Sequence, residues 1–285
     1  MKHILVTGAN GQLGNELRLL APQYAESCQF FFTDVQELDI TDRKAIYAFI
    51  ENNRIDTVVN CAAFTAVDKA ESEPELCDLL NHIAPGYLAE AVAAQGGTMV
   101  QVSTDYVFDG EGCVPYREED PTNPQGVYGR TKLEGEEAVI RQCAGSMVIR
   151  TAWLYSTFGQ NFVKTMLRLG RERESLGVVF DQIGSPTYAR DLAQAILTAI
   201  DKGIVPGVYH FTNEGVCSWY DFTRAIHSIA GITGCKVSPI HTADYPVPAK
   251  RPHYSVLDKS KIKSAYGIDI RWWEDALKEC MEGLH

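Results

Sequence analysis

The sequence has no excess of positive charge. Its 285 residues carry 26 Lys and Arg against 37 Asp and Glu, a formal net charge of -11. General nucleic-acid binding needs the opposite balance and is excluded. The acidic excess is confined to residues 1–150, with 11 basic and 23 acidic side chains, whereas residues 151–285 hold 15 and 14. We therefore expect the two halves to have different functions.

Long apolar runs are also absent. No segment approaches the roughly 20 residues of a membrane helix, and Ile4–Val6 runs directly into Thr7 and Gly8 without the apolar region of a signal peptide. The eight cysteines show no Cys-x-x-Cys and no Cys/His pair at zinc spacing. We expect a cytoplasmic protein that binds no membrane, with buried free thiols and no bound metal.

Short β-branched runs alternate with amphipathic segments in the first half. Strands are predicted at Ile4–Val6, Phe30–Thr33, Thr57–Val59, Met99–Val102 and Met147–Ile149, and helices at Leu13–Leu20, Lys44–Glu51, Glu75–Ala94 and Lys132–Arg141. This alternation predicts an α/β fold, a Rossmann-like doubly wound parallel sheet with helices on both faces. At 45% hydrophobic residues, the chain can bury a large core.

The second half predicts a smaller α/β lobe. Strands are expected at Val178–Phe180 and Val208–Phe211, and helices at Asn161–Leu169, Tyr188–Ile200 and Ser218–Ala230. The Pro- and Lys-rich segment Thr242–Lys263 is expected to loop over a surface. We expect a dinucleotide-binding domain over residues 1–155 and a mainly substrate-binding lobe over 156–285, with about 181–213 returning to the first domain.

Three glycines follow the first predicted strand, at Gly8, Gly11 and Gly14. They permit a tight turn into a helix whose first amides can bind the pyrophosphate of a dinucleotide. Asp34 follows the second strand, where a carboxylate accepts hydrogen bonds from the adenosine ribose and repels a 2′-phosphate. No Arg follows Asp34 closely, so this site favours NAD modestly. A purely structural glycine turn and a strand-terminal Asp remain alternatives.

Tyr128 and Lys132 are four residues apart, so on a helix they share one face. An ammonium near a phenol lowers the pKa of the phenol and favours proton exchange near neutral pH. Thr104 ends the fourth predicted strand, at the edge where open parallel sheets bind ligands, and its hydroxyl can hold a carbonyl or alkoxide oxygen. These three side chains are predicted to be catalytic.

Longer segments resemble the extended short-chain dehydrogenase/reductase family, and the resemblance covers nearly the whole chain. The segments are Val58–Glu71, Ser103–Gly110, Arg150–Tyr155, Asn161-Phe162, Arg251-Pro252 and Ser255–Asp258. They are most similar to members that use NADPH or NADH to reduce the C4 ketone of a dTDP-linked sugar. The resemblance therefore implies a nucleotide-sugar substrate.

The resemblance also assigns site residues. It implies that Thr104, Tyr128 and Lys132 form the catalytic triad, with Lys132 also binding the nicotinamide ribose. It implies that the dinucleotide contacts Gly11, Gln12, Leu13, Asp34, Asp39, Ile40, Ala62, Ala63 and Thr65, and that the sugar nucleotide contacts Thr104, Asp105, Trp153 and Val67. Trp153 and Val67 are also readable as packing residues.

Two alternatives remain open. Dehydratases of this family typically follow the Thr-Asp pair with Glu, whereas this chain has Tyr106, and epimerases usually have a Ser-rich strand end; both are disfavoured. A non-catalytic cofactor-binding subunit, resembling the regulatory β subunit of methionine adenosyltransferase, is not excluded by the motifs.

The resemblance to members that dimerise through Mg²⁺ implies a possible homodimer. The matching dipeptide here is Arg190-Asp191, and an Arg opposes cation binding, so no metal is predicted; Glu16 is expected to be a solvated neighbour. In the near-neutral second half, the substrate diphosphate is expected to meet some of the cations Lys164, Arg168, Lys250 and Arg251.

Overall fold

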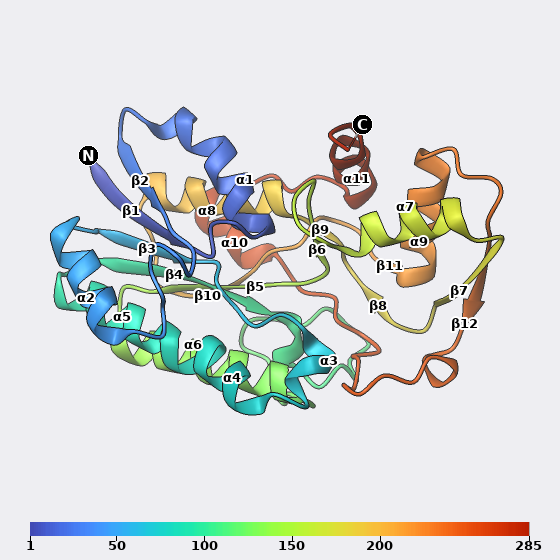
Figure 1. Ribbon diagram of the computed structural model, residues 1–285, viewed down its shortest axis with the longest axis horizontal. Coiled ribbons are helices and arrows are strands. Elements are labelled where there is room, and N and C mark those ends of the chain that lie inside the picture. The colour runs from blue at the N-terminus through green and yellow to red at the C-terminus, as the bar shows by residue number, and fades with distance from the viewer. Residues whose placement is uncertain (285) are drawn as a thin grey trace.

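Six parallel strands form the central sheet of the computed structural model, which describes residues 1–284 (Figure 1). The strand order is β10-β5-β4-β3-β1-β2. Their bounds are Lys2–Thr7 (β1), Cys28–Phe32 (β2), Thr57–Asn60 (β3), Thr98–Thr104 (β4), Met147–Thr151 (β5) and Gly207–His210 (β10). The predicted Rossmann-like doubly wound sheet is thereby confirmed. The chain runs outward from β1 to β2 and then crosses back to β3, so the strand order reverses between β1 and β3.

Helices cover both faces of this sheet, and β1 shows why its sequence is apolar throughout. Ile4 and Val6 point into one core and Leu5 into the other, since successive strand residues face opposite sides. One face carries α1 (Gln12–Leu20), α8 (Ala189–Lys202) and α10 (Ser260–Tyr266), and the other carries α2 (Arg43–Asn52), α5 (Ala84–Ala94) and α6 (Val127–Gln142).

The single helix predicted over Glu75–Ala94 is interrupted in the structure. It consists of α4 (Pro74–Asp78), a π-helical turn (η2, Leu79–Ile83) and α5. Pro85 has no N–H for the carbonyl of Asn81, four residues earlier, so the regular helical ladder is broken there. The Asn81 side chain instead binds the backbone of Phe64, at 2.8 Å to its nitrogen and 3.1 Å to its oxygen.

Helix α6 begins at Val127, five residues earlier than the predicted helix. Gly126 takes an extended conformation at the N-cap, and the amide of Val127 donates to the Glu71 carboxylate at 2.8 Å. That carboxylate satisfies an amide that has no partner within the helix. As a result both Tyr128 and Lys132 lie on α6.

A second apolar core lies beside the sheet, built by α7 (Phe162–Glu172), α9 (Trp219–Ile229) and α11 (Trp273–Glu282). Strands β7 (Ser175–Val179) and β12 (Lys236–Ile240) pair in parallel below α7 and α9. Short strand pairs join this lobe to the loops around the sheet: β6 (Leu154–Tyr155) with β9 (Thr187–Tyr188), and β8 (Ile183–Gly184) with β11 (Cys217–Ser218).

Several predicted bounds in this half need correction. The strand expected at Val178–Phe180 is β7, which ends at Val179. The segment Thr242–Lys263 is not entirely loop, because it holds the short helix η4 (Thr242–Asp244) and the start of α10. Strand β12 was missed because Pro239 is unfavourable within a central strand, but it fits a two-stranded sheet where one edge needs no donor.

Several segments from the second half of the chain pack with the first half around the central sheet. Strand β10 and helices α8 and α10 all pack with the N-terminal segments around the sheet, although they come from the second half of the chain. The remaining short helices are η1 (Ala21–Tyr24), α3 (Val67–Ala70) and η3 (Asp105–Val107). Within residues 1–284, no helix has both the length and the apolar character needed to cross a membrane.

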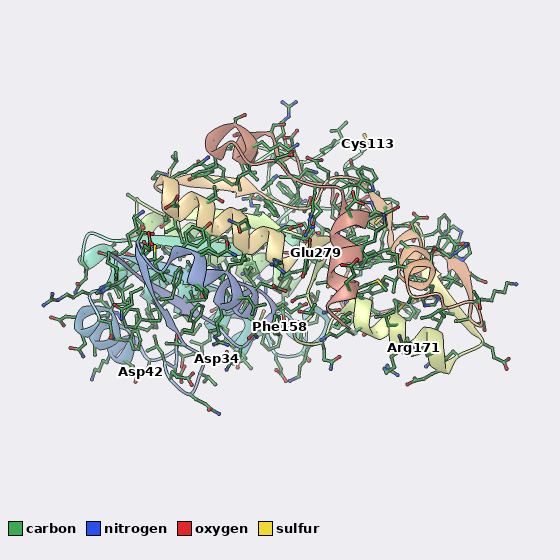
Figure 2. All side chains as sticks on the ribbon, turned by 90° about the horizontal axis from the view of Figure 1, so that it is seen from above. Asp34, Asp42, Cys113, Phe158, Arg171 and Glu279 are labelled. Atoms are coloured by element: carbon green, nitrogen blue, oxygen red, sulfur yellow. The ribbon has the colours of Figure 1, made fainter. Side chains whose placement is uncertain are left out.

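All eight cysteines are free thiols, and six of them are buried. Cys113 departs from the expectation of burial, because it lies at the surface (Figure 2). Cys61 is half-buried.

Candidate active site

A cleft of about 840 Å³ opens at the carboxyl ends of the parallel strands, at the reversal of strand order between β1 and β3. This is the general ligand-binding position of open α/β sheets. Leaving aside the basic residues expected at the diphosphate, all but one of the residues predicted for catalysis, the dinucleotide or the sugar line it: Gly8, Gly11, Gln12, Leu13, Asp34, Asp39, Ile40, Ala62, Ala63, Thr65, Val67, Thr104, Asp105, Tyr128, Lys132 and Trp153. Residues more than 140 positions apart in the chain therefore share one cavity.

Gly14 is the exception and does not line the cleft. A Cβ built there would lie 2.5 Å from the Cα of Ala9 and 2.7 Å from the carbonyl oxygen of Gly8. Gly14 therefore lets α1 pack against the turn, and its contact with the cofactor stays a prediction.

The glycine turn leaves room for a bound group. Gly8 has φ +61°, and a Cβ there would lie 2.6 Å from the amide nitrogen of Ala62, so only glycine fits. Gly11 is the N-cap of α1 and has no side chain to bind the helix amides. The first N–H groups of α1, at Gln12 and Leu13, can therefore donate to an anion, as a dinucleotide pyrophosphate requires.

The catalytic candidates converge from β4 and α6. Thr104 ends β4, and its hydroxyl donates to Asp105 Oδ1 at 2.9 Å. Lys132 is 4% exposed, and its Nζ donates to the carbonyl of Val102 at 2.6 Å. Tyr128 is half-buried one helical turn before Lys132, with its ring edge-on to Tyr106 at 5.4 Å between centroids.

Burial is the largest influence on the pKa values of both Tyr128 and Lys132. It raises the pKa of Tyr128 above its ordinary value of about 10, although a hydrogen bond with Thr104 opposes the shift. Burial lowers the pKa of Lys132 to about 8, against the attraction of the Glu136 carboxylate. The expectation that the Lys132 ammonium lowers the pKa of Tyr128 is therefore wrong for this arrangement. Tyr128 is protonated at neutral pH, which is the state of a proton donor.

Asp105 places a buried carboxylate beside Thr104. It is 3% exposed, and burial raises its pKa to about 6 even though the Thr104 hydroxyl lowers it. Its Oδ2 atom has no hydrogen-bond partner within the described residues. Asp105 lines the cleft, so its carboxylate lies beside any ligand bound there, with an oxygen whose hydrogen-bonding capacity is unused.

An ion pair beneath the site fastens α6 to the sheet. Arg150 on β5 donates to both oxygens of Glu136 on α6, at 2.7 Å from Nη2 to Oε2 and 3.0 Å from Nε to Oε1. Ser103 on β4 donates to Glu136 Oε1 at 2.5 Å. The side chains are 5% and 2% exposed for Arg150 and Glu136. The pair thereby fixes Lys132, one turn away from Glu136, relative to Thr104.

Aromatic side chains form the wall contributed by the second lobe. Trp153 has φ +51°, a strained conformation for a non-glycine residue, and stacks on Trp219 with 3.5 Å between ring centroids. Both rings line the cleft. Trp219 was missed by the sequence reasoning, since nothing in its local sequence distinguishes it from a core aromatic at the start of a helix.

Of the four basic residues proposed for a diphosphate, only Arg251 lines the cleft. Its guanidinium binds Asp68 Oδ2 at 2.5 Å and the hydroxyl of Tyr106 at 3.0 Å. The other three lie elsewhere: Lys164 binds the carbonyl of Gly159, Arg168 pairs with Glu172, and Lys250 pairs with Glu111. Arg251 is thus already paired with a carboxylate, which reduces its capacity to bind a diphosphate.

In the region that corresponds to the metal site of the Mg²⁺-bridged dimers, the carboxylates form ion pairs with arginines. Arg271 binds Asp191 and Glu279, and Arg190 lies 3.7 Å from Glu279. Glu16 is buried, not solvated as expected, and accepts from the hydroxyl of Ser156 at 2.6 Å; burial raises its pKa. Absence of a metal here stays a prediction, supported by this local cationic charge.

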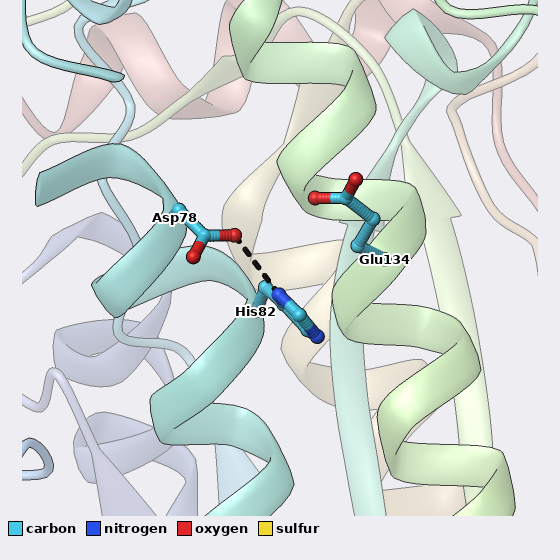
Figure 3. Close-up of side chains that lie close together, drawn as sticks. All are labelled: Asp78, His82 and Glu134. Atoms are coloured by element: carbon cyan, nitrogen blue, oxygen red, sulfur yellow. Dashed lines mark hydrogen bonds and ion pairs between the residues drawn. The ribbon is translucent and has the colours of Figure 1, made fainter. Parts of the chain in front are cut away.

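Asp78, His82 and Glu134 gather on the outer face of α4, η2 and α6 (Figure 3). His82 Nδ1 lies 2.9 Å from Asp78 Oδ1, an i,i+4 contact along the helix. These side chains are half-buried and outside the cleft, and the contact accounts for the positions of Asp78 and His82 without a ligand.

Comparisons with known proteins agree over the whole chain. Residues 1–285 match a family model described as the RmlD substrate binding domain. A dTDP-4-dehydrorhamnose reductase of Aggregatibacter actinomycetemcomitans is 42% identical, with 98% of each chain covered, and one of Escherichia coli strain K12 is 39% identical over 99% of this chain and 98% of its own. A solved dTDP-4-dehydrorhamnose reductase from Bacillus anthracis in complex with NADP superposes with TM-score 0.94 at 37% identity, covering 99% of each chain.

Proposed function

The chain belongs to the RmlD substrate binding domain family, and we propose that it reduces the C4 ketone of dTDP-4-dehydro-β-L-rhamnose to dTDP-L-rhamnose with NADPH or NADH. The observation that carries the proposal is the convergence of Thr104, Tyr128 and Lys132 with the glycine turn in one cleft. The relatives named as dTDP-4-dehydrorhamnose reductases, at about 40% identity over nearly the full chain, support the same enzyme.

Proton transfer in this reaction is assigned to Tyr128. The nicotinamide cofactor supplies the hydride to C4 when bound. The ketone oxygen then gains negative charge, and the Tyr128 phenol gives its proton to that oxygen, yielding the alcohol. Thr104 lies beside the phenol and positions the oxygen, and the unpartnered Asp105 Oδ2 offers an acceptor for a sugar hydroxyl.

The cofactor site is assigned to the glycine turn and its neighbours. The amides of Gln12 and Leu13 would hold the pyrophosphate, Asp34 the adenosine ribose, and Lys132 the nicotinamide ribose. Asp39, Ile40, Ala62, Ala63 and Thr65 complete this side of the cleft. The sugar nucleotide is assigned to the other side, with Val67 and Trp153.

We also propose a division of the chain between these ligands. Residues 1–155 and about 181–213 form the dinucleotide-binding domain, and most of 156–285 forms the substrate-binding lobe. Helix α10 and the residues after it also pack on the first domain, so a second return is made by about residues 260–270. A homodimer and a cytoplasmic location stay predictions.

Tyr106 favours reduction over dehydration. Its phenol occupies the position at which dehydratases of this fold typically carry Glu, and it binds Arg251. A phenol whose pKa is raised by burial cannot act as the carboxylate base that dehydration requires. The dTDP-glucose 4,6-dehydratase structures, at 17–20% identity, share the fold alone with this chain.

The test is consumption of reduced nicotinamide in the presence of dTDP-4-dehydrorhamnose, followed separately with NADPH and NADH. We expect multiple turnovers with stoichiometric oxidised cofactor and dTDP-L-rhamnose as product. Stable binding of cofactor without turnover would favour the regulatory-subunit alternative. Water loss from dTDP-glucose without net cofactor consumption would favour a dehydratase.

The lowered pKa of Lys132 predicts an alkaline limb in the activity. A lysine is charged below its pKa, so kcat/KM should fall as pH rises through about 8, where Lys132 loses its proton. The Glu136 carboxylate raises that pKa, so Glu136→Gln should move the limb to lower pH. The measurement is kcat/KM from pH 6 to 10 for both proteins, and an unmoved limb in the variant would assign it to another group.

A further inference from the structure

An arginine on α1 is joined through Asn10 to Asp34; it does not itself line the cleft, whereas Asp34 does. Its side chain, Arg18, is stacked over the ring of Phe32, with 5.0 Å from Cζ to the ring centroid. Phe32 ends β2, two residues before Asp34. The fold therefore brings a cation from a preceding helix to the strand end at which the sequence placed only an acid (Figure 2 labels Asp34).

Asparagines tie Arg18 to the glycine turn. Arg18 Nη1 donates to Asn15 Oδ1 at 3.1 Å, and Nη2 donates to Asn10 Oδ1 at 3.5 Å. Asn15 in turn donates to the carbonyls of Asn10 and Gly11, both at 2.9 Å. The guanidinium is thus held beside the turn that faces the cofactor pyrophosphate.

Asp34 belongs to the same cluster. Its Oδ2 accepts from the amide of Asn10 at 3.1 Å and its Oδ1 from the amide of Val35 at 2.8 Å. These backbone donors anchor the carboxylate. Within the described residues the hydrogen bonds of the Arg18 guanidinium go to the two asparagine oxygens, so most of its five N–H donors stay available to an anion.

We propose that Arg18 binds the adenosine 2′-phosphate of NADPH and so admits NADPH to a site whose Asp34 by itself would favour NADH. A planar guanidinium, held on an aromatic ring, matches phosphate oxygens in a bidentate manner. Its positive charge offsets the repulsion between the Asp34 carboxylate and the phosphate. This inference rests on the proposed function only for the position of the dinucleotide.

The test measures binding of 2′,5′-ADP and of 5′-AMP by calorimetry, which needs no sugar substrate. Arg18→Met should weaken 2′,5′-ADP about tenfold, the size of one charge-assisted hydrogen bond, and change 5′-AMP less than about twofold. Arg18→Lys should weaken 2′,5′-ADP binding by an intermediate amount, because lysine keeps the positive charge but lacks the paired N–H donors of the guanidinium. Arg224→Met is the matched control, since Arg224 lies over the ring of Tyr220 in the second lobe and away from the cleft.

Equal weakening of both ligands, or no weakening of 2′,5′-ADP, would overturn the assignment of Arg18. With turnover, Arg18→Met should raise KM for NADPH about tenfold and leave KM for NADH nearly unchanged. Arg18-dependent binding of 2′,5′-ADP in a protein without reductase activity would leave this inference standing and contradict the proposed reaction. Turnover with an unchanged NADPH to NADH ratio in Arg18→Met would contradict this inference alone.

Discussion

Tyr128→Phe should reduce kcat about a thousandfold while leaving the affinity for NADPH within about threefold. A positioned general acid contributes ~10² to 10⁴ in rate, and phenylalanine keeps the ring while removing the proton that the ketone oxygen must receive. Its ring also preserves the edge-on packing against Tyr106, so the cleft should keep its shape. The measurement pairs steady-state turnover with NADPH binding followed by fluorescence.

Tyr47→Phe supplies the matched control, because Tyr47 lies on α2 outside the cleft and stacks with Arg43 at 5.5 Å. The same loss of a hydroxyl there should leave kcat unchanged. If Tyr128→Phe retained more than about a tenth of kcat, Tyr128 would not be the proton donor. If it lost NADPH affinity in parallel with kcat, its contribution would be to binding instead.

Arg150→Met should destabilise the fold by about 3–5 kcal/mol, the usual cost of removing one partner from a buried ion pair. Glu136, whose side chain is 2% exposed, would then keep the Ser103 hydroxyl as its hydrogen-bond partner and the more distant Lys132 as its nearest cation. Since Glu136 lies one turn from Lys132, the variant should also lose kcat. Urea denaturation measures the change in the free energy of unfolding.

Two variants separate this loss from a general effect of removing an arginine. The double variant Glu136→Gln, Arg150→Met removes both charges of the pair and should recover part of the stability; Lys132 then lacks the Glu136 carboxylate, so recovery is incomplete. Arg168→Met breaks an exposed pair with Glu172, whose side chains are 58% and 54% exposed, and should cost less than ~1 kcal/mol. An Arg150→Met loss no larger than that of Arg168→Met would contradict the role given to the buried pair.

The strands and the glycine turn were predictable because their chemistry is local. A strand buried on both faces is apolar at every position, as in Ile4, Leu5 and Val6, and a turn into a helix that approaches another backbone needs glycine at Gly8. Helix ends were less predictable, since they depend on distant partners. Helix α6 begins at Val127 because the carboxylate of Glu71, the residue directly after α3, accepts a hydrogen bond from the Val127 amide.

For the candidate site, too, some features were predictable from local sequence and others were not. Thr104, Tyr128 and Lys132 were identifiable because spacing on a helix and position at a strand end are properties of the sequence. The ionisation of Tyr128 was predicted in the wrong direction. Burial governs the pKa of a phenol once water is removed, and burial is known only after the second lobe and α6 are in place.

Patterns of nearby residues were enough to predict the strands, the dinucleotide turn and each of the three catalytic candidates, because burial on both faces, glycine spacing, helical spacing and a strand end can all be read locally. Only the tertiary structure decided which charged groups share the cleft. It paired Arg251 with Asp68, left Lys164 and Lys250 outside the cleft, and placed Arg18 over Phe32, two residues before Asp34. Electrostatic interactions depend on distance and burial in space, and strand crossovers make both independent of separation along the sequence.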